Sequence, residues 1–253
     1  MSYAIVNGKL VKRKRDHDDV VMPPISSKPS IKLPDDIKDH IAATVRSYVL
    51  PFRSACWFRA IIGNFVLHTL GIEASVAIGS MLYRAGPDEY RDVMAYCGQG
   101  NVAYVTPEGS FLGHAWLQTD TDIIDFSVAD WRDASGIDDD LDEIITADRA
   151  LRDANNKLGA IQWTAPTLPK YFWRPINSFP KWRPWSEGDK VTPDLGDCWY
   201  GPIRKSSRDE AYRRFRAISD DLVNDELVVH VLANNIEAIR LKERIAELKE
   251  MAA

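Results

Sequence analysis

Hydrophobic residues recur at helical intervals in the first part of the chain, and this pattern predicts two neighbouring helices. In the range 35–48 the apolar positions are spaced by four, four and three residues: Ile37, Ile41, Val45 and Tyr48. This spacing places them on one face of a helix. The range 55–70 follows Ser54, a plausible N-cap, and ends before Gly71. It is apolar around most of its circumference, which is typical of a helix inside a fold. Its apolar residues are Phe58, Ile61, Ile62, Phe65, Val66 and Leu70.

Short apolar runs separated by polar turns follow these helices and predict strands. The runs cover the ranges 74–83, 101–106, 111–118 and 122–126. Polar turns at 107–110 and 119–121 separate the last three. Because these connections are short, we expect antiparallel neighbours in a meander.

The last third of the chain combines an aromatic, proline-rich segment with helices. The range 163–202 holds Trp163, Trp173, Trp182, Trp185 and Trp199, with six prolines from Pro166 to Pro193. This composition excludes a regular helix and predicts an extended arm whose rings pack on the core. The range 206–250 is helical in pattern. Its final helix is expected to be lined by Leu227, Val231, Ile236, Ile239 and Leu248. That helix could dock on the core or mediate homo-oligomer formation.

These elements predict an α+β protein with three parts. Residues 1–34 are expected to be an N-terminal tail, in which the basic run 12–15 is followed at once by acidic residues. Residues 35–160 form the expected core, with a helix packed on an antiparallel sheet. Residues 161–253 form the arm and a C-terminal helical extension packed on that core.

Composition and charge narrow the functional classes. The chain has 253 residues, of which 45% are hydrophobic, and a net charge of −5. A negative net charge argues against a general nucleic-acid binder. The stretch 60–83 is interrupted by polar residues, so no membrane span is expected. Residues 1–10 lack the apolar run of a secretory signal. The three cysteines are far apart and odd in number, which fits a reducing compartment. We therefore expect a cytoplasmic protein.

Cofactor and metal motifs are not found in the sequence. There is no phosphate-binding Walker loop, and Gly98-Gln99-Gly100 lacks the third glycine of a dinucleotide site. The five histidines are isolated from one another and from cysteines at ligand spacing. No cofactor and no metal are expected.

One set of residues points to nucleophilic chemistry. Cys56 lies in the first turn of the predicted apolar helix, where backbone N–H groups and the helix dipole stabilise a thiolate. Arg53 and Arg59 add positive charge. His114 lies on a predicted strand, and Asp125 lies on the next one. If these two strands form a hairpin, Asp125 can orient the imidazole while the other ring nitrogen faces Cys56, as in a catalytic triad.

Each of these residues also has a structural interpretation. A free cysteine in a helix is usually a core residue, and a histidine on a strand is usually a buried structural group. In that case the Cys56 sulfur and the His114 ring are expected to lie apart. Asp122 is a second candidate for the orienting carboxylate. Cys97 is expected to be structural, since no helix is predicted there to activate it, and Cys198 is expected to pack within the tryptophan-rich arm.

The pairs Cys56-Trp57 and His114-Ala115-Trp116, followed by Asp125, resemble the transglutaminase-like core of the wider papain-like group of cysteine enzymes. The resemblance covers about residues 40–130, and both the Cys, His, Asp order and the helix-then-strands context agree with it. It implies Cys56 as nucleophile, His114 as general acid and base, and Asp125 as orienting carboxylate.

The resemblance also implies an oxyanion hole. The Cys56 backbone N–H would supply one donor. Papain-like proteases place a glutamine six positions before the cysteine, where this chain has Leu50. Arg53, Tyr48 or Arg46 could take that part.

The function implied is cysteine-dependent acyl transfer or hydrolysis through an acyl-enzyme, with a peptide or small acyl substrate and an amide of peptide or isopeptide type. Trp57 and Trp116 would shape the pocket. An alternative is a catalytically silent copy of the same core that binds a protein or ligand. A third interpretation is a structural protein without a site.

Overall fold

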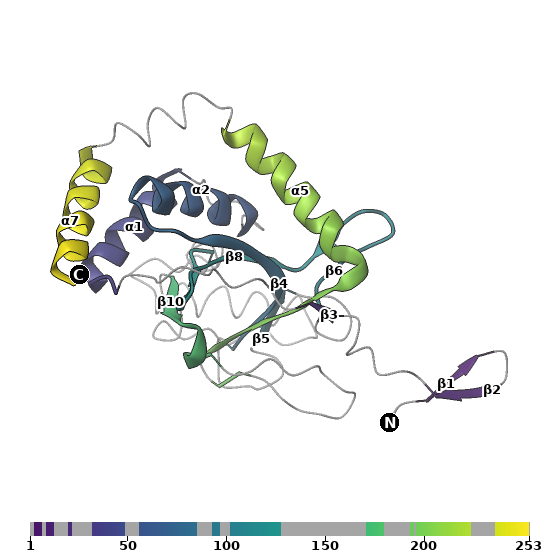
Figure 1. Ribbon diagram of the computed structural model, residues 1–253. Coiled ribbons are helices and arrows are strands. Elements are labelled where there is room, and N and C mark those ends of the chain that lie inside the picture. Colours follow the sequence, from purple (N-terminus) through teal and green to yellow (C-terminus); the bar gives the residue numbers. More distant parts are fainter. Residues whose placement is uncertain are drawn as a thin grey trace, which may run out of the picture.

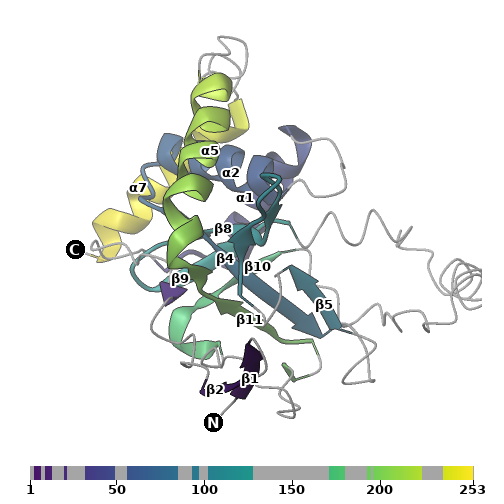
Figure 2. The same cartoon turned by 90° about the vertical axis from the view of Figure 1, so that its right-hand side faces the viewer.

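A curled antiparallel sheet with helices packed on it forms the centre of the computed structural model, so the chain is α+β (Figure 1). The structure describes residues 3–6, 9–12, 20–21, 32–48, 56–84, 93–96, 102–127, 171–179, 193–194, 196–223 and 236–252. In two perpendicular views the helices gather on one side of the sheet (Figure 1 and Figure 2).

The helices are α1 (Asp35–Tyr48), α2 (Cys56–Thr69), α5 (Lys205–Val223) and α7 (Ile236–Ala252), with a 3-10 turn, η3 (Ile176–Ser178). The first strands are β1 (Tyr3–Val6), β2 (Lys9–Lys12), β3 (Val20–Val21), β4 (Ser75–Arg84), β5 (Val93–Tyr96) and β6 (Tyr104–Val105). The later strands are β7 (Phe111–Leu112), β8 (His114–Gln118), β9 (Asp122–Asp125), β10 (Phe172–Pro175), β11 (Cys198–Gly201) and β12 (Ile203–Arg204).

The central sheet has six strands in the order β10-β9-β8-β4-β11, and β5 also pairs with β4. Every pairing in it is antiparallel. The ten-residue strand β4 is the hub, because β8, β5 and β11 all pair with it. Three further two-stranded pairs are β1-β2, β12-β3 and β6-β7.

The two predicted helices and the strands at 74–83 and 122–126 are confirmed to within one or two residues. Gly71 ends α2 with φ of 72°, a conformation that glycine adopts without strain, and its N–H donates to the carbonyl of His68. The predicted strand 111–118 is instead divided at Gly113. There an added Cβ would meet Ala103 at 2.7 Å and the backbone oxygen of Gly79 at 2.8 Å, so the strands approach more closely than a side chain permits.

The expected meander is only partly correct. Strands β8 and β9 are sequential neighbours joined through the turn at 119–121. Strands β6 and β7 form a separate hairpin, and β8 pairs with β4 instead. Strand β5, which the sequence pattern did not indicate, also borders β4.

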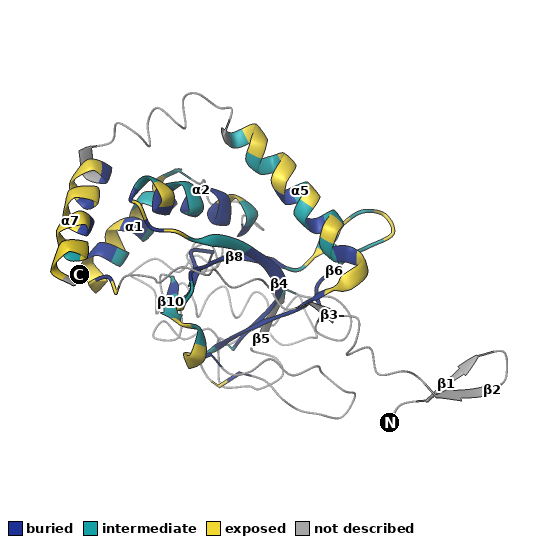
Figure 3. Cartoon of the chain, viewed as in Figure 1, coloured by how far each residue is buried: buried dark blue, intermediate teal, exposed yellow. Residues whose placement is uncertain are grey.

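Helix α2 lies inside the fold, as expected from its composition (Figure 3). Ile62, Val66 and Leu67 pack with residues of α1, β8 and β9. Ala60 and Ile61 pack with residues of β4, β8 and α5. The prediction was wrong for Phe58, which is 42% exposed because it lies on the outer side of the first turn.

The aromatic segment is more closely integrated than an arm lying on a core. Phe172–Pro175 pairs with β9, and Cys198–Gly201 pairs with β4, so both belong to the central sheet. Trp173 packs beside Phe126, and Trp199 is buried. Trp163, Trp182 and Trp185 lie outside the described residues.

Helix α7 packs on the core through Ala238, Leu241 and Ile245. Ile239 was expected in this buried face but is 45% exposed, because it lies one position outside the stripe formed by 238, 241 and 245. Leu248 packs against the core as expected. Leu227, Val231 and the side chain of Ile236 lie outside the described residues.

Part of the expected N-terminal tail is extended and paired. Strands β1 and β2 form a hairpin, and β3 pairs with β12. Among the described residues, no helix has the length and apolar character needed to cross a membrane.

Candidate active site

Cys56 is the first residue of α2 and is 7% exposed. The apolar body of α2 packs against β8 and β4, which brings the helix N-terminus to the sheet. The first N–H groups of a helix have no acceptor within the helix, and they carry the positive end of its dipole. The thiol is therefore held where negative charge is stabilised.

His114 begins β8 and is completely buried. It stands opposite Gly79 of β4. Its Nε2 lies 2.7 Å from Oδ2 of Asp125, which ends β9 and is 1% exposed. The β8-β9 register, in which Leu117 opposes Ile124, places Asp125 diagonally from His114 when continued by one residue pair. The hairpin expected from the sequence thus brings the two side chains together.

The Cys56 side chain lies close enough to His114 to contribute to the raised pKa of the imidazole. Because Asp125 engages Nε2, Nδ1 is the ring nitrogen that can face the thiol. The imidazole therefore lies between the sulfur and the carboxylate. The interpretation of Cys56 and His114 as unconnected core residues predicted that they would lie apart.

The electrostatics of the pair favour a charged imidazole. Burial alone lowers the pKa of His114, but the charge and hydrogen bond of Asp125, with contributions from Cys56, outweigh it and raise the pKa to about 10. Burial alone raises the pKa of Asp125, but the charge and hydrogen bond of His114 outweigh it, and the net pKa is lowered. At neutral pH the buried pair is an imidazolium and a carboxylate, and an adjacent cation stabilises a thiolate.

Two further donors satisfy the buried carboxylate. The backbone N–H of Ser127 donates to Oδ1 of Asp125 at 2.8 Å. The hydroxyl of Tyr200, on β11, donates to Oδ2 at 3.0 Å. A buried charge is tolerated only when it is paired and hydrogen-bonded, and Asp125 meets both conditions.

Aromatic rings surround the imidazole. The ring of Trp116 is nearly parallel to that of His114, at 6.1 Å between centroids, and the ring of Tyr96 lies 5.3 Å away. Trp116 in turn contacts Tyr200 at 4.9 Å. These rings keep the polar groups away from water and restrict the rotation of His114.

Of the other predicted site residues, Trp57 packs against Phe111 at 5.1 Å and Phe215 at 5.7 Å, beside the site. Tyr48 ends α1 and packs against the cluster that α1 shares with α2. Arg53 and Leu50 lie outside the described residues.

The alternative site residues are placed elsewhere. Asp122 lies at the opposite end of β9 and accepts from the hydroxyl of Thr121 at 2.5 Å, so Asp125 is the carboxylate beside His114. Arg46 is exposed. Arg59 is buried, and its guanidinium donates to the carbonyl of Val45 at 3.5 Å.

Cys198 differs from Cys56 in its surroundings. It is fully buried in β11, and burial together with the charge of Asp125 raises its pKa well above the ordinary value. It therefore remains a protonated core thiol, as the sequence suggested. Cys97 lies outside the described residues.

The sequence analysis missed Tyr200, Tyr96 and Ser127. Ser127 could have been found from its position two residues after Asp125, because aspartate side chains commonly accept from a nearby backbone N–H. Tyr200 comes from β11, which pairs with β4 from a distant part of the chain, and Tyr96 comes from β5, the strand after β4 that the sequence pattern did not indicate. Their partners depend on sheet order, which local sequence patterns do not contain.

No group of three or more histidine, cysteine, aspartate or glutamate side chains suited to a metal ion occurs among the described residues.

Comparison with known proteins gives a family match over part of the chain. Residues 37–141 match a family model described as "Protein of unknown function (DUF2026)". The matched range contains Cys56, His114 and Asp125 and ends before Tyr200. The search of curated proteins found no match. A similar solved structure is described as "The crystal structure of genomics APC5867", with 16% identity and a TM-score of 0.43, covering 83% of this chain and 82% of that chain.

Proposed function

We propose that this protein is a cysteine-dependent acyl-transfer enzyme or hydrolase with a transglutaminase-like core. The observation that carries the proposal is the position of the His114 imidazole, which is bonded through Nε2 to Asp125 and lies close enough to the Cys56 side chain for Cys56 to raise the imidazole pKa. Nucleophile, base and orienting acid in this relation form the arrangement that activates a cysteine.

The fold supports the same proposal. The cysteine begins a buried helix, and the histidine and aspartate lie on successive antiparallel strands against which that helix packs. This is the arrangement expected of a transglutaminase-like or papain-like core.

The first half-reaction follows from the charges. The Cys56 thiolate attacks a carbonyl carbon, and the electron pair of the C=O bond moves to oxygen. The backbone N–H of Cys56, at the helix N-terminus, can donate to that oxyanion. The tetrahedral intermediate collapses as His114 gives its proton to the leaving amine or alcohol. A thioester to Cys56 remains, with a neutral imidazole.

The second half-reaction reverses these proton movements. Neutral His114 takes a proton from water or from an acceptor amine, which attacks the thioester carbonyl. The C–S bond breaks and Cys56 leaves as a thiolate beside the restored imidazolium. Water yields hydrolysis, and an amine yields acyl transfer.

The burial of the site indicates the side of approach. Cys56 is 7% exposed, whereas His114 is 0% and Asp125 is 1% exposed. A substrate therefore reaches the site from the sulfur side, near the helix N-terminus.

Reactivity of Cys56 tests the proposal without knowledge of the substrate. The alkylation rate with iodoacetamide is measured between about pH 4 and about pH 10, with mass spectrometry to locate the label. We expect Cys56 to react at a rate that reaches a plateau below about pH 7, and Cys56→Ser to remove the label. The plateau should disappear in His114→Ala. Cys198→Ser is the matched control and should leave the profile unchanged.

Catalysis itself is tested with p-nitrophenyl acetate. A burst of p-nitrophenol with an acetyl group recovered on Cys56 supports the acyl-enzyme. An unreactive Cys56, or a profile that follows an ordinary thiol at about pH 8.5 with or without His114, contradicts the proposal and favours a silent binding module.

A further inference from the structure

We propose that Tyr200 is a positioning residue of the site, which holds the Asp125 carboxylate against His114. This inference rests on the proposed function. It assigns a role to a residue that lies far along the chain from Cys56, His114 and Asp125.

The geometry of one oxygen atom carries the inference. Oδ2 of Asp125 lies 2.7 Å from Nε2 of His114 and 3.0 Å from the hydroxyl oxygen of Tyr200. The backbone N–H of Ser127 fixes the other oxygen, Oδ1, at 2.8 Å. Each carboxylate oxygen is therefore hydrogen-bonded to a fixed partner, and these bonds prevent the carboxylate from turning away from the imidazole.

The Tyr200 side chain is itself well fixed. It is 5% exposed, and its strand β11 pairs with β4 so that Tyr200 opposes Met81. Its ring contacts Trp116 at 4.9 Å and Phe179 at 5.2 Å. Because the Tyr200 ring is fixed by its packing in the sheet, its hydroxyl holds the Asp125 carboxylate in one position.

The Tyr200 hydroxyl acts only as a donor here. Burial and the charge of Asp125 raise the pKa of Tyr200 well above its ordinary value, so the hydroxyl keeps its proton. Its hydrogen bond also lowers the pKa of Asp125. Removing the hydroxyl therefore leaves a buried carboxylate with one donor fewer, which takes up a proton at a higher pH and releases His114 from its orientation.

The segment that carries Tyr200 completes the site from outside the family match. The matched range ends at residue 141, and β11 reaches the site because it pairs with β4. The C-terminal part of the chain thus supplies a hydrogen-bond donor to the His114-Asp125 pair.

Tyr200→Phe tests this role, because it removes the hydroxyl and keeps the ring. Tyr83→Phe is the matched control, since Tyr83 is also buried in the same cluster and contacts Phe172 at 5.6 Å. The pH profile of iodoacetamide alkylation at Cys56 is measured for both full-length variants, with thermal unfolding recorded beside it.

We expect the acidic limb of the Tyr200→Phe profile, on which the alkylation rate rises with pH, to move upward by about half to one pH unit, so that the rate at a given pH on that limb is about three- to tenfold lower. Tyr83→Phe should keep the wild-type limb. A purely structural role for Tyr200 would lower the unfolding temperature without moving the limb.

Asp125→Asn provides a second test. If Tyr200 acts through the carboxylate, adding Tyr200→Phe to Asp125→Asn changes the profile no further. An unmoved limb in Tyr200→Phe, or an additive effect in the double variant, overturns the positioning role and leaves the proposed function in place. A wild-type profile that does not depend on His114 overturns the proposed function and this inference together.

Discussion

Gly79 and His114 face each other across β4 and β8, and the space beside Gly79 is filled by the chain itself. A Cβ added at Gly79 would collide with the carbonyl oxygen of Gly201 and would lie 2.9 Å from the ring of Trp116. Trp116 is the ring stacked beside His114. The tight packing of β4 against β8 and β11 therefore depends on the absence of a side chain at this position.

We predict that Gly79→Ala lowers the free energy of unfolding by about 3 kcal/mol, because a backbone atom cannot move aside as a flexible side chain can. Gly71→Ala is a useful comparison. It places a side chain at φ of 72°, where the nearest atom is the flexible Nζ of Lys249 at 3.3 Å, and should cost about 1 kcal/mol. Urea denaturation measures both values. Equal stabilities for Gly79→Ala and wild type would contradict the packing argument.

The buried His114-Asp125 pair predicts how stability depends on pH. The pKa of His114 is raised to about 10 in the folded protein, compared with about 6.5 when unfolded. Its contribution to the free energy of unfolding is fully present below about pH 6.5 and is lost as the pH rises towards about 10. In this interval we expect the free energy of unfolding to fall by up to about 1.4 kcal/mol per pH unit from this group.

Asp125 causes the decline of the free energy of unfolding on the acidic side of the pH curve. Its pKa is lowered in the folded protein, so its contribution is present above the ordinary value near 3.8 and is lost as the pH falls below it. Urea denaturation at a series of pH values measures both limbs. His114→Gln is the control, because it should flatten the alkaline decline. An alkaline decline that persists in His114→Gln would show that other groups cause it.

The local parts of the fold could be predicted from the sequence, because they depend on spacing and turn chemistry. Helices α1 and α2 follow from apolar periodicity, and the His114-Asp125 pair follows from a short hairpin. The contribution of Tyr200 could not be predicted, because it depends on β11 pairing with a strand more than a hundred residues earlier. Phe58 and Ile239 show a related limit, since apolar residues beside a buried stripe can remain exposed.

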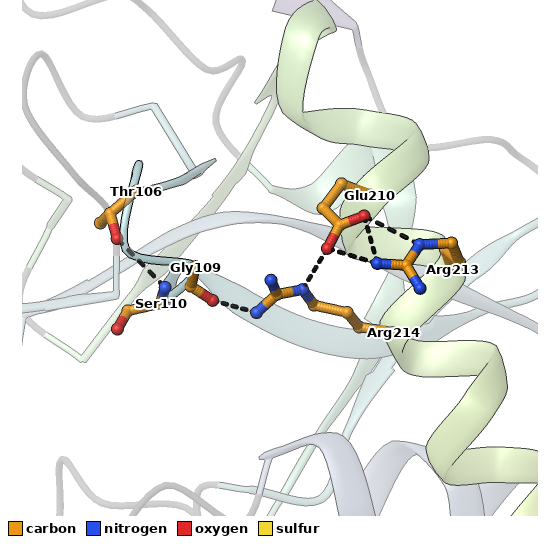
Figure 4. Close-up of polar contacts among 6 residues, drawn as sticks. All are labelled: Thr106, Gly109, Ser110, Glu210, Arg213 and Arg214. Atoms are coloured by element: carbon orange, nitrogen blue, oxygen red, sulfur yellow. Dashed lines mark hydrogen bonds and ion pairs between the residues drawn. The ribbon is translucent and has the colours of Figure 1, made fainter.

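Arg214 joins α5 to the hairpin that follows β6 (Figure 4). Its guanidinium donates to the carbonyl oxygen of Gly109 and pairs with Glu210 at 2.5 Å. Arg213 also pairs with Glu210, at 2.7 Å, but is largely exposed. Of these two arginines, Arg214 is the one that bonds to the turn.

We predict that Arg214→Ala lowers the free energy of unfolding by about 1 kcal/mol and increases hydrogen exchange at the amides of Gly109 and Ser110. These amides donate to Thr106 within the turn, at 2.8 and 3.1 Å. Arg213→Ala should change stability by less than about 0.5 kcal/mol and leave this exchange unchanged, as exposed ion pairs contribute little. Faster exchange in both variants would show that the helix, and not the Arg214 contact, controls the turn.

Helix α7 gives a matched pair of isoleucines. Ile245 is 1% exposed and packs in the cluster that includes Leu67 and Leu70 of the α2 end, whereas Ile239, on the same helix, is 45% exposed. We predict that Ile245→Ala lowers the free energy of unfolding by about 3 kcal/mol, from lost burial and the cavity that remains. Ile239→Ala should change it by less than about 0.5 kcal/mol. Urea denaturation compares the two. Similar losses of stability in both variants would mean that Ile239 is covered in solution, as in a homo-oligomer formed through α7. Size-exclusion chromatography with light scattering would then show a mass above that of the monomer.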